Sequence, residues 1–105
     1  MEYEYRIEDN EDHALVKLPK EVMITYSNQF KEMLQSLYDQ VYNTIILDCE
    51  QLQMFDTAGI SGVAVFQKKL KDRGGELKMI NVANDYIKHY FKTIELSKVV
   101  SIEEI

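Results

Sequence analysis

The stretch that decides the fold covers residues 43–60 and reads NTIILDCEQLQMFDTAGI. Residues 44–49 form a short run of β-branched and apolar side chains, which predicts a strand covered on both faces. A loop over residues 50–55 follows, and the turn at residues 56–59 opens a helix. The stretch therefore predicts a strand, a loop and a helix in immediate succession.

A pair of strands is predicted near the start of the chain. Apolar and polar residues alternate over residues 2–8, which is typical of a strand. The polar residues 9–12 predict a turn, and residues 13–18 predict a second strand. The two strands could pair as an antiparallel hairpin that ends near Pro19, because proline has no N–H for a strand ladder.

Helices are predicted on both sides of the decisive stretch. Apolar side chains recur every three or four positions over residues 26–42, which indicates an amphipathic helix. Thr25 or Ser27 is the expected cap of this helix. The helix that opens after the decisive stretch is expected to end at Gly74 and Gly75, a pair typical of helix ends.

In the last part of the chain, strands and a helix again alternate. Residues 76–82 predict another buried strand, and residues 99–102 a short final one. Asn84 can cap a third helix, whose apolar face would contain Ile87, Tyr90, Phe91 and Ile94. The order of elements predicts an α/β fold: a mixed, mostly parallel central sheet with helices packed on it and an N-terminal antiparallel hairpin.

Length and charge narrow the possible functions. The chain has 105 residues, near the common size of one domain. Acidic residues outnumber basic ones by 18 to 12 and give a net charge of −6, which argues against nucleic-acid binding. The single cysteine cannot form an intramolecular disulfide, and no apolar run approaches the ~20 residues of a membrane helix. We therefore expect a cytoplasmic protein without membrane insertion.

The turn formed by Asp56, Thr57, Ala58 and Gly59 is the main candidate site. A helix N-terminus presents free N–H groups and a partial positive charge, so a phosphate on a hydroxyl there is electrostatically favourable. Glycine permits close approach of backbone or a partner. The alternative is purely structural, since Asp and Thr are both favoured N-caps.

Catalysis has little support in the sequence. His13 and His89 fall on different predicted elements, and neither has a nucleophile or acid at a recognisable spacing. No cysteine–histidine set has the spacing of a metal site, and Cys49 is expected to be a small buried side chain. A small enzyme is one alternative hypothesis. We expect instead a binding protein without a metal or cofactor, and not an enzyme.

The chain resembles the anti-sigma factor antagonists of bacteria, which belong to the STAS domain family. The resemblance rests first on residues 43–60, which are similar to the family's strand, loop and Asp-Ser/Thr-x-Gly-Leu/Ile phosphorylation turn. It continues through residues 74–77, similar to a Gly-Gly-Glu/Lys-Leu turn, and residues 87–96, similar to the family's third helix. The resemblance implies a single STAS domain over residues 1–105.

The resemblance implies a partner-switching role in transcription regulation. In the family, the unphosphorylated protein binds an anti-sigma factor that is also a serine/threonine kinase, and thereby frees the sigma factor. Phosphorylation of the turn's hydroxyl ends this binding, and a serine/threonine phosphatase restores it. By position, the acceptor would be Thr57, and the partner-binding residues would be Asp56, Thr57, Ala58, Gly59 and Ile60.

Two differences from the family pattern bear on this expectation. The family often carries Gly-Glu-Leu/Ile-Asp before its first helix, whereas residues 20–23 read Lys-Glu-Val-Met here. The acceptor is threonine rather than the commoner serine, and Ala58 leaves Thr57 as the only hydroxyl of the turn. The change near Met23 motivates the alternative of a STAS regulatory subunit without a phosphorylation cycle, in a transporter or other signalling complex.

Overall fold

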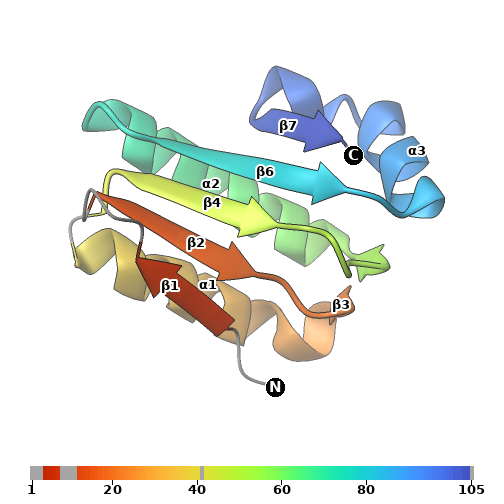
Figure 1. Ribbon diagram of the computed structural model, residues 1–105, viewed down its shortest axis with the longest axis horizontal. Coiled ribbons are helices and arrows are strands. Elements are labelled where there is room, and N and C mark those ends of the chain that lie inside the picture. Colours follow the sequence, from red (N-terminus) through yellow and green to blue (C-terminus); the bar gives the residue numbers. More distant parts are fainter. Residues whose placement is uncertain (1–3, 8–11, 41, 105) are drawn as a thin grey trace.

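The computed structural model describes residues 4–7, 12–40 and 42–104 (Figure 1). One sheet has the strand order β1-β2-β4-β6-β7. Its strands are β1 (Glu4–Ile7), β2 (His13–Lys17), β4 (Thr44–Asp48), β6 (Glu76–Val82) and β7 (Ser101–Glu104). Strands β1 and β2 are antiparallel, whereas the other neighbouring pairs are parallel. The predicted mixed, mostly parallel sheet and antiparallel strand pair are confirmed, while residues 2, 3 and 8–11 of that prediction lie outside the described residues.

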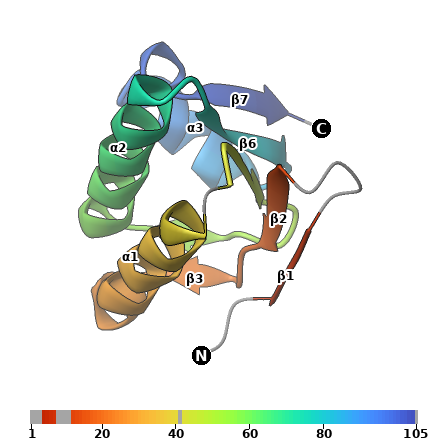
Figure 2. The ribbon, with the colours of Figure 1, turned by 90° about the vertical axis from the view of Figure 1, so that its left-hand side faces the viewer.

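Three α-helices connect the parallel strands. They are α1 (Ile24–Asp39), α2 (Thr57–Asp72) and α3 (Asp85–Thr93). Figure 2 shows α1 and α2 together on one side of the sheet. Crossovers between parallel strands are almost always right-handed, and two that advance in the same direction place their helices on the same face. A short 3₁₀ helix, η1 (Leu96–Lys98), which the sequence did not predict, leads into β7.

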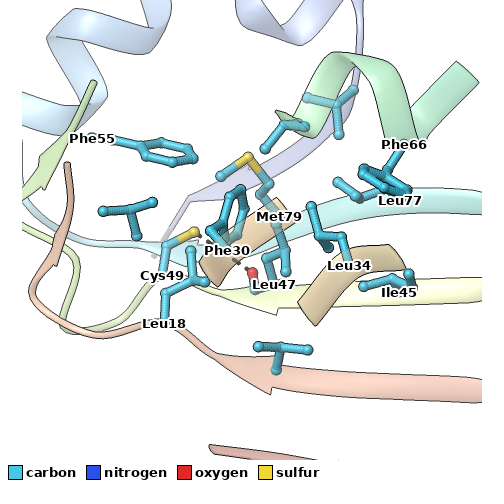
Figure 3. Close-up of a cluster of buried hydrophobic side chains, with 14 of the residues drawn as sticks. Leu18, Phe30, Leu34, Ile45, Leu47, Cys49, Phe55, Phe66, Leu77 and Met79 are labelled. Carbon is cyan, nitrogen blue, oxygen red and sulfur yellow. Dashed lines mark hydrogen bonds between the residues drawn. The ribbon is translucent and has the colours of Figure 1, made fainter. Parts of the chain in front are cut away.

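The core lies between the helices and the face of the sheet that they cover (Figure 3). Strand β4 contributes Ile45 and Leu47, which are fully buried. They meet side chains from α1, α2 and β6, among them Phe30, Leu34, Phe66, Leu77 and Met79. This core fixes where the carboxyl end of β4 and the start of α2 lie.

No helix of the described residues covers the other face of the sheet (Figure 2), so the prediction that residues 44–49 are covered on both faces is wrong. On β4, Thr44, Ile46 and Asp48 are only partly buried, in strict alternation with the core residues. Ile46 stands beside Lys78 of β6 in the parallel register. The apolar run of β4 therefore forms one buried row and one half-exposed row.

The ends of the helices match the sequence expectations in two cases of three. Asn84 caps α3, and its side-chain oxygen accepts a hydrogen bond from the backbone N–H of Ile87 at 3.0 Å. Helix α2 ends at Asp72, two positions before Gly74, whose φ is +85°. The cap expected for the first helix is wrong: Thr25 and Ser27 lie inside α1, which begins after an extended Met23 that makes no side-chain cap hydrogen bond.

Candidate functional site

Asp56 is the N-cap of α2. Its backbone is extended, with φ −94° and ψ 177°, and its side-chain Oδ1 accepts a hydrogen bond from the N–H of Gly59 at 2.9 Å. Its carbonyl accepts the first helical hydrogen bond from Ile60 at 3.0 Å. Asp56 thus fills the structural role that sequence reasoning allowed for either Asp56 or Thr57.

Thr57 is the first residue of α2 and is exposed. Its position places the hydroxyl beside the N–H groups of the first helical turn, where the helix dipole favours negative charge. Ala58 is half-buried, Gly59 is buried, and Ile60 packs partly against the core. Within the predicted site, Thr57 is therefore the residue most open to an enzyme or a partner.

Gly59 faces inward, toward Phe55. A Cβ on this glycine would overlap the Phe55 ring, so the close approach that glycine permits is made by this chain's own side chain. Phe55 in turn packs edge-on against Phe30 and Phe91, with ring centroids 5.7 and 6.0 Å apart. The turn at residues 56–59 is thus set directly on an aromatic part of the core.

A two-stranded parallel sheet, which sequence reasoning missed, holds the segment before the turn. It pairs β3 (Glu21–Val22) with β5 (Met54–Phe55). The carbonyl of Lys20 accepts from the N–H groups of Gln53 and Met54 at 2.7 and 3.1 Å. The only signal in the sequence was two short alternations of apolar and polar residues. A segment of two residues is too short for such an alternation to predict a strand.

This small sheet brings the segment that differs from the family pattern next to the candidate site. The N–H of Asp56 donates to the carbonyl of Val22 at 3.1 Å, so residues 20–23 directly fix the position of the cap. Glu21 stands opposite Met54 in the register, and the Met54 side chain is 40% exposed. We call Glu21, Met54 and Thr57 the turn surface, since all three are exposed around the start of α2.

The other candidate residues do not gather into a second site. His13 begins β2, at the end of the sheet away from α3, whereas His89 is exposed on α3 (Figure 1). Cys49 is buried, and burial raises the pKa of its thiol, so the reactive thiolate is disfavoured. Within residues 4–7, 12–40 and 42–104, no group of three or more His, Cys, Asp or Glu residues is placed to hold a metal ion.

The fold and the turn define a class: a small α/β domain with an exposed hydroxyl at the start of its second helix. The family model of the STAS domain matches residues 4–104, and the chain belongs to this family. No curated protein sequence matches it significantly. Over the described part of the chain, no helix combines the length and apolar character needed to cross a membrane.

Three solved structures illustrate the likeness. TM1081 of Thermotoga maritima, a proposed anti-sigma factor antagonist, superposes with a TM-score of 0.84 at 19% identity, over 98% of this chain and 86% of that one. The anti-sigma factor antagonist SpoIIAA in its unphosphorylated form gives 0.80 at 17% identity, over 96% and 87%. The phosphorylated form of SpoIIAA, a Bacillus cell fate determinant, gives 0.72 at 16% identity, over 96% and 90%. At these identities the likeness establishes the fold.

Proposed function

We propose that this protein is an anti-sigma factor antagonist that acts by partner switching in the bacterial cytoplasm. Its unphosphorylated form binds an anti-sigma factor that is also a serine/threonine kinase, and this binding frees the sigma factor. Phosphorylation of Thr57 ends the binding, and a serine/threonine phosphatase restores it. The protein is a binding module in this scheme, not an enzyme.

One observation carries the proposal: Thr57 is an exposed hydroxyl at the first position of α2, directly after the Asp56 cap. A related fold, SpoIIAA, exists in an unphosphorylated and a phosphorylated form. In the present chain the turn is already ordered by the hydrogen bond between Asp56 and Gly59. A kinase would therefore find the acceptor presented on a fixed surface.

Electrostatics explain how a phosphate would act as the switch. The group adds roughly −1.5 to −2 charges and a bulky set of acceptor oxygens. On Thr57 it would lie beside Asp56, in a chain whose net charge is already −6. The helix N-terminus offers only about 0.3–1 kcal/mol of stabilisation in return, so a docked partner would meet an uncompensated clash. Binding would end without refolding of the domain.

The turn surface gives the partner contact its shape. Met54 offers an exposed apolar side chain, opposite Glu21 on the neighbouring strand and three positions before Thr57 in the chain. Since residues 20–23 hold this surface in place, their difference from the family pattern would act on partner choice. The same region would serve the alternative function, a STAS subunit of a transporter or other complex, without phosphorylation.

The proposal is tested by co-purification from the native cell with the full chain as bait. We expect wild type to retain a histidine-kinase-like serine/threonine kinase, and the Thr57→Glu variant to lose it. Ser61→Glu is the matched control, because Ser61 is exposed on α2 one turn further along and adds the same charge. Retention of the kinase by Thr57→Glu, or capture of transporter components alone, contradicts partner switching.

Phosphorylation itself is tested with the recovered kinase and ATP. Mass spectrometry should place one phosphate on Thr57, and Thr57→Ser should remain a substrate. Label that persists in Thr57→Ala would show that the acceptor is another residue.

A further inference from the structure

A hollow of about 140 Å³ opens in the C-terminal part of the fold, among α3, η1 and the strands β6 and β7. Figure 1 shows these elements grouped together, in shades from cyan to dark blue. The described residues that line the hollow are Val82, Lys88, Phe91, Lys92, Ser97 and Ile102. None of them belongs to the turn at residues 56–59, so the hollow is a feature separate from the proposed role of Thr57.

The floor of the hollow is apolar and includes an aromatic ring. Val82 and Phe91 are buried, and Ile102 is half-buried. Lysine side chains that line an apolar surface contribute their methylene stems to it and keep their charged ends in water. An occupant therefore gains most from an apolar body. An aromatic ring gains more than an aliphatic one of the same size, because aromatic rings attract each other beyond the area that they bury.

The polar groups beside the hollow favour a neutral occupant. Lys92 already has an interaction partner within the protein, so its charge is engaged. An anion would have to leave water for the ammonium group of Lys88 alone, and the cost of desolvating two charges often exceeds the gain from their pairing. Ser97, exposed on η1, supplies a neutral hydroxyl that can donate or accept a hydrogen bond.

We propose that this hollow binds a neutral molecule with one aromatic ring and one hydroxyl group, of the class of simple phenols. The ring would lie over Phe91 and Val82, and its hydroxyl would form a hydrogen bond with that of Ser97 at the rim. The volume agrees with a ligand of this size, since a protein cavity of about 150 Å³ accommodates a benzene ring and this hollow is close to that volume. Apolar walls with a few placed polar groups are also the usual composition of small-molecule sites.

The test is a titration of the full chain with phenol, followed by amide chemical shifts. We expect saturable shifts at the amides of Phe91, Ser97 and Ile102. Cyclohexanol keeps the hydroxyl but lacks the aromatic ring, and it should bind roughly two- to tenfold more weakly. Benzoate should bind at least about tenfold more weakly, because its charge must be desolvated. No saturable shift with phenol, or equal affinity for cyclohexanol or benzoate, overturns the proposal.

Variants of the lining test the hydrogen bond and the apolar contact separately. Ser97→Ala removes the hydroxyl partner and should weaken phenol binding roughly two- to tenfold. Ile102→Phe should fill the hollow and abolish the shifts. Ile94→Phe is the matched control, because it makes the same exchange at an exposed residue outside the lining and should bind phenol as wild type does. Unchanged binding in either lining variant, or an equal loss in Ile94→Phe, contradicts the site.

The role of charge is tested at Lys88. Lys88→Met keeps an unbranched apolar stem and removes the ammonium group, so phenol should bind within about twofold of wild type. A larger loss would show that the ammonium group recruits the ligand, which contradicts a neutral occupant.

Discussion

The ring of Phe55 lies against Gly59, in the space that a Cβ on that residue would occupy. Phe55 is only 4% exposed and is held between the rings of Phe30 and Phe91. The ring therefore cannot move aside without disturbing the core. The start of α2, and with it the exposed Thr57, takes its position from this contact.

We expect Gly59→Ala to destabilise the domain. The added methyl group would overlap the Phe55 ring, and forced overpacking of a core typically costs about 1–3 kcal/mol. The free energy of unfolding, measured in urea by circular dichroism, should fall by that amount. Adding Phe55→Leu to the variant should recover part of the loss, since the smaller side chain vacates the contact.

Gly62→Ala is the control for this prediction. Gly62 is also in α2 and buried, but a Cβ there would first meet the flexible stem of Lys31, at 3.2 Å. Alanine is favoured over glycine in a helix interior by about 1 kcal/mol, so this variant should be neutral or more stable. Similar losses in both variants would show that helix flexibility, rather than the Phe55 contact, explains the effect.

Asp56 should contribute to stability mainly as a cap. Asp56→Ala removes the acceptor of the Gly59 N–H and should cost about 1 kcal/mol, the usual value for a lost N-cap. Asp56→Asn keeps an acceptor and should cost only a few tenths of a kcal/mol. Urea unfolding distinguishes the two variants, and Asn84→Ala, which removes the cap of α3, provides a reference of the same kind. An equal loss in Asp56→Asn would mean that charge, not capping, is the important property.

Most of the sheet could be predicted from sequence because its signals are local. The apolar run of β4, the helical spacing of Phe30, Leu34 and Leu37, and the cap at Asn84 each depend on residues close together in the chain. The half-exposed row of β4 could not be predicted in this way. Whether Ile46 is covered depends on which face of the sheet α1 and α2 pack against. That face is set by the handedness of the crossovers.

The surroundings of the site were the less predictable part. The hydrogen bonds of Lys20 to Gln53 and Met54 join segments more than thirty positions apart. Likewise, position 59 requires glycine because the Phe55 side chain packs against it, and the sequence pattern around position 59 does not predict this contact. Sequence reasoning located the turn at the start of a helix, but only packing shows which residues hold it there.

A negative charge on Thr57 should leave the free domain folded. At the first position of α2 the helix dipole stabilises the charge by about 0.3–1 kcal/mol, and repulsion from the neighbouring Asp56 opposes this gain. We therefore expect Thr57→Glu to change the free energy of unfolding in urea by less than about 1 kcal/mol, so that the loss of partner binding expected under the proposed function would not arise from unfolding. Unfolding of this variant at neutral pH would mean that the loss of binding reflects a loss of structure.

Cys49 should make the free energy of unfolding of the domain fall as the pH rises in the alkaline range. Burial, reinforced by the charge of Asp48, raises the pKa of its thiol in the folded state. In the unfolded chain a thiol ionises near pH ~8.5, so above that pH the unfolded state binds fewer protons and stability falls as pH rises. Between about pH 7 and pH 10 this contribution amounts to about 2 kcal/mol.

The measurement compares wild type with Cys49→Ala, because the other alkaline titrations are common to both. The free energy of unfolding of wild type should fall more steeply than that of the variant by about 2 kcal/mol between about pH 7 and pH 10. The native thiol should also resist alkylation by iodoacetamide until the domain unfolds, since the thiolate is the reactive form. Parallel pH dependence together with rapid native alkylation would show that Cys49 ionises in the folded protein and is accessible, contrary to its buried position.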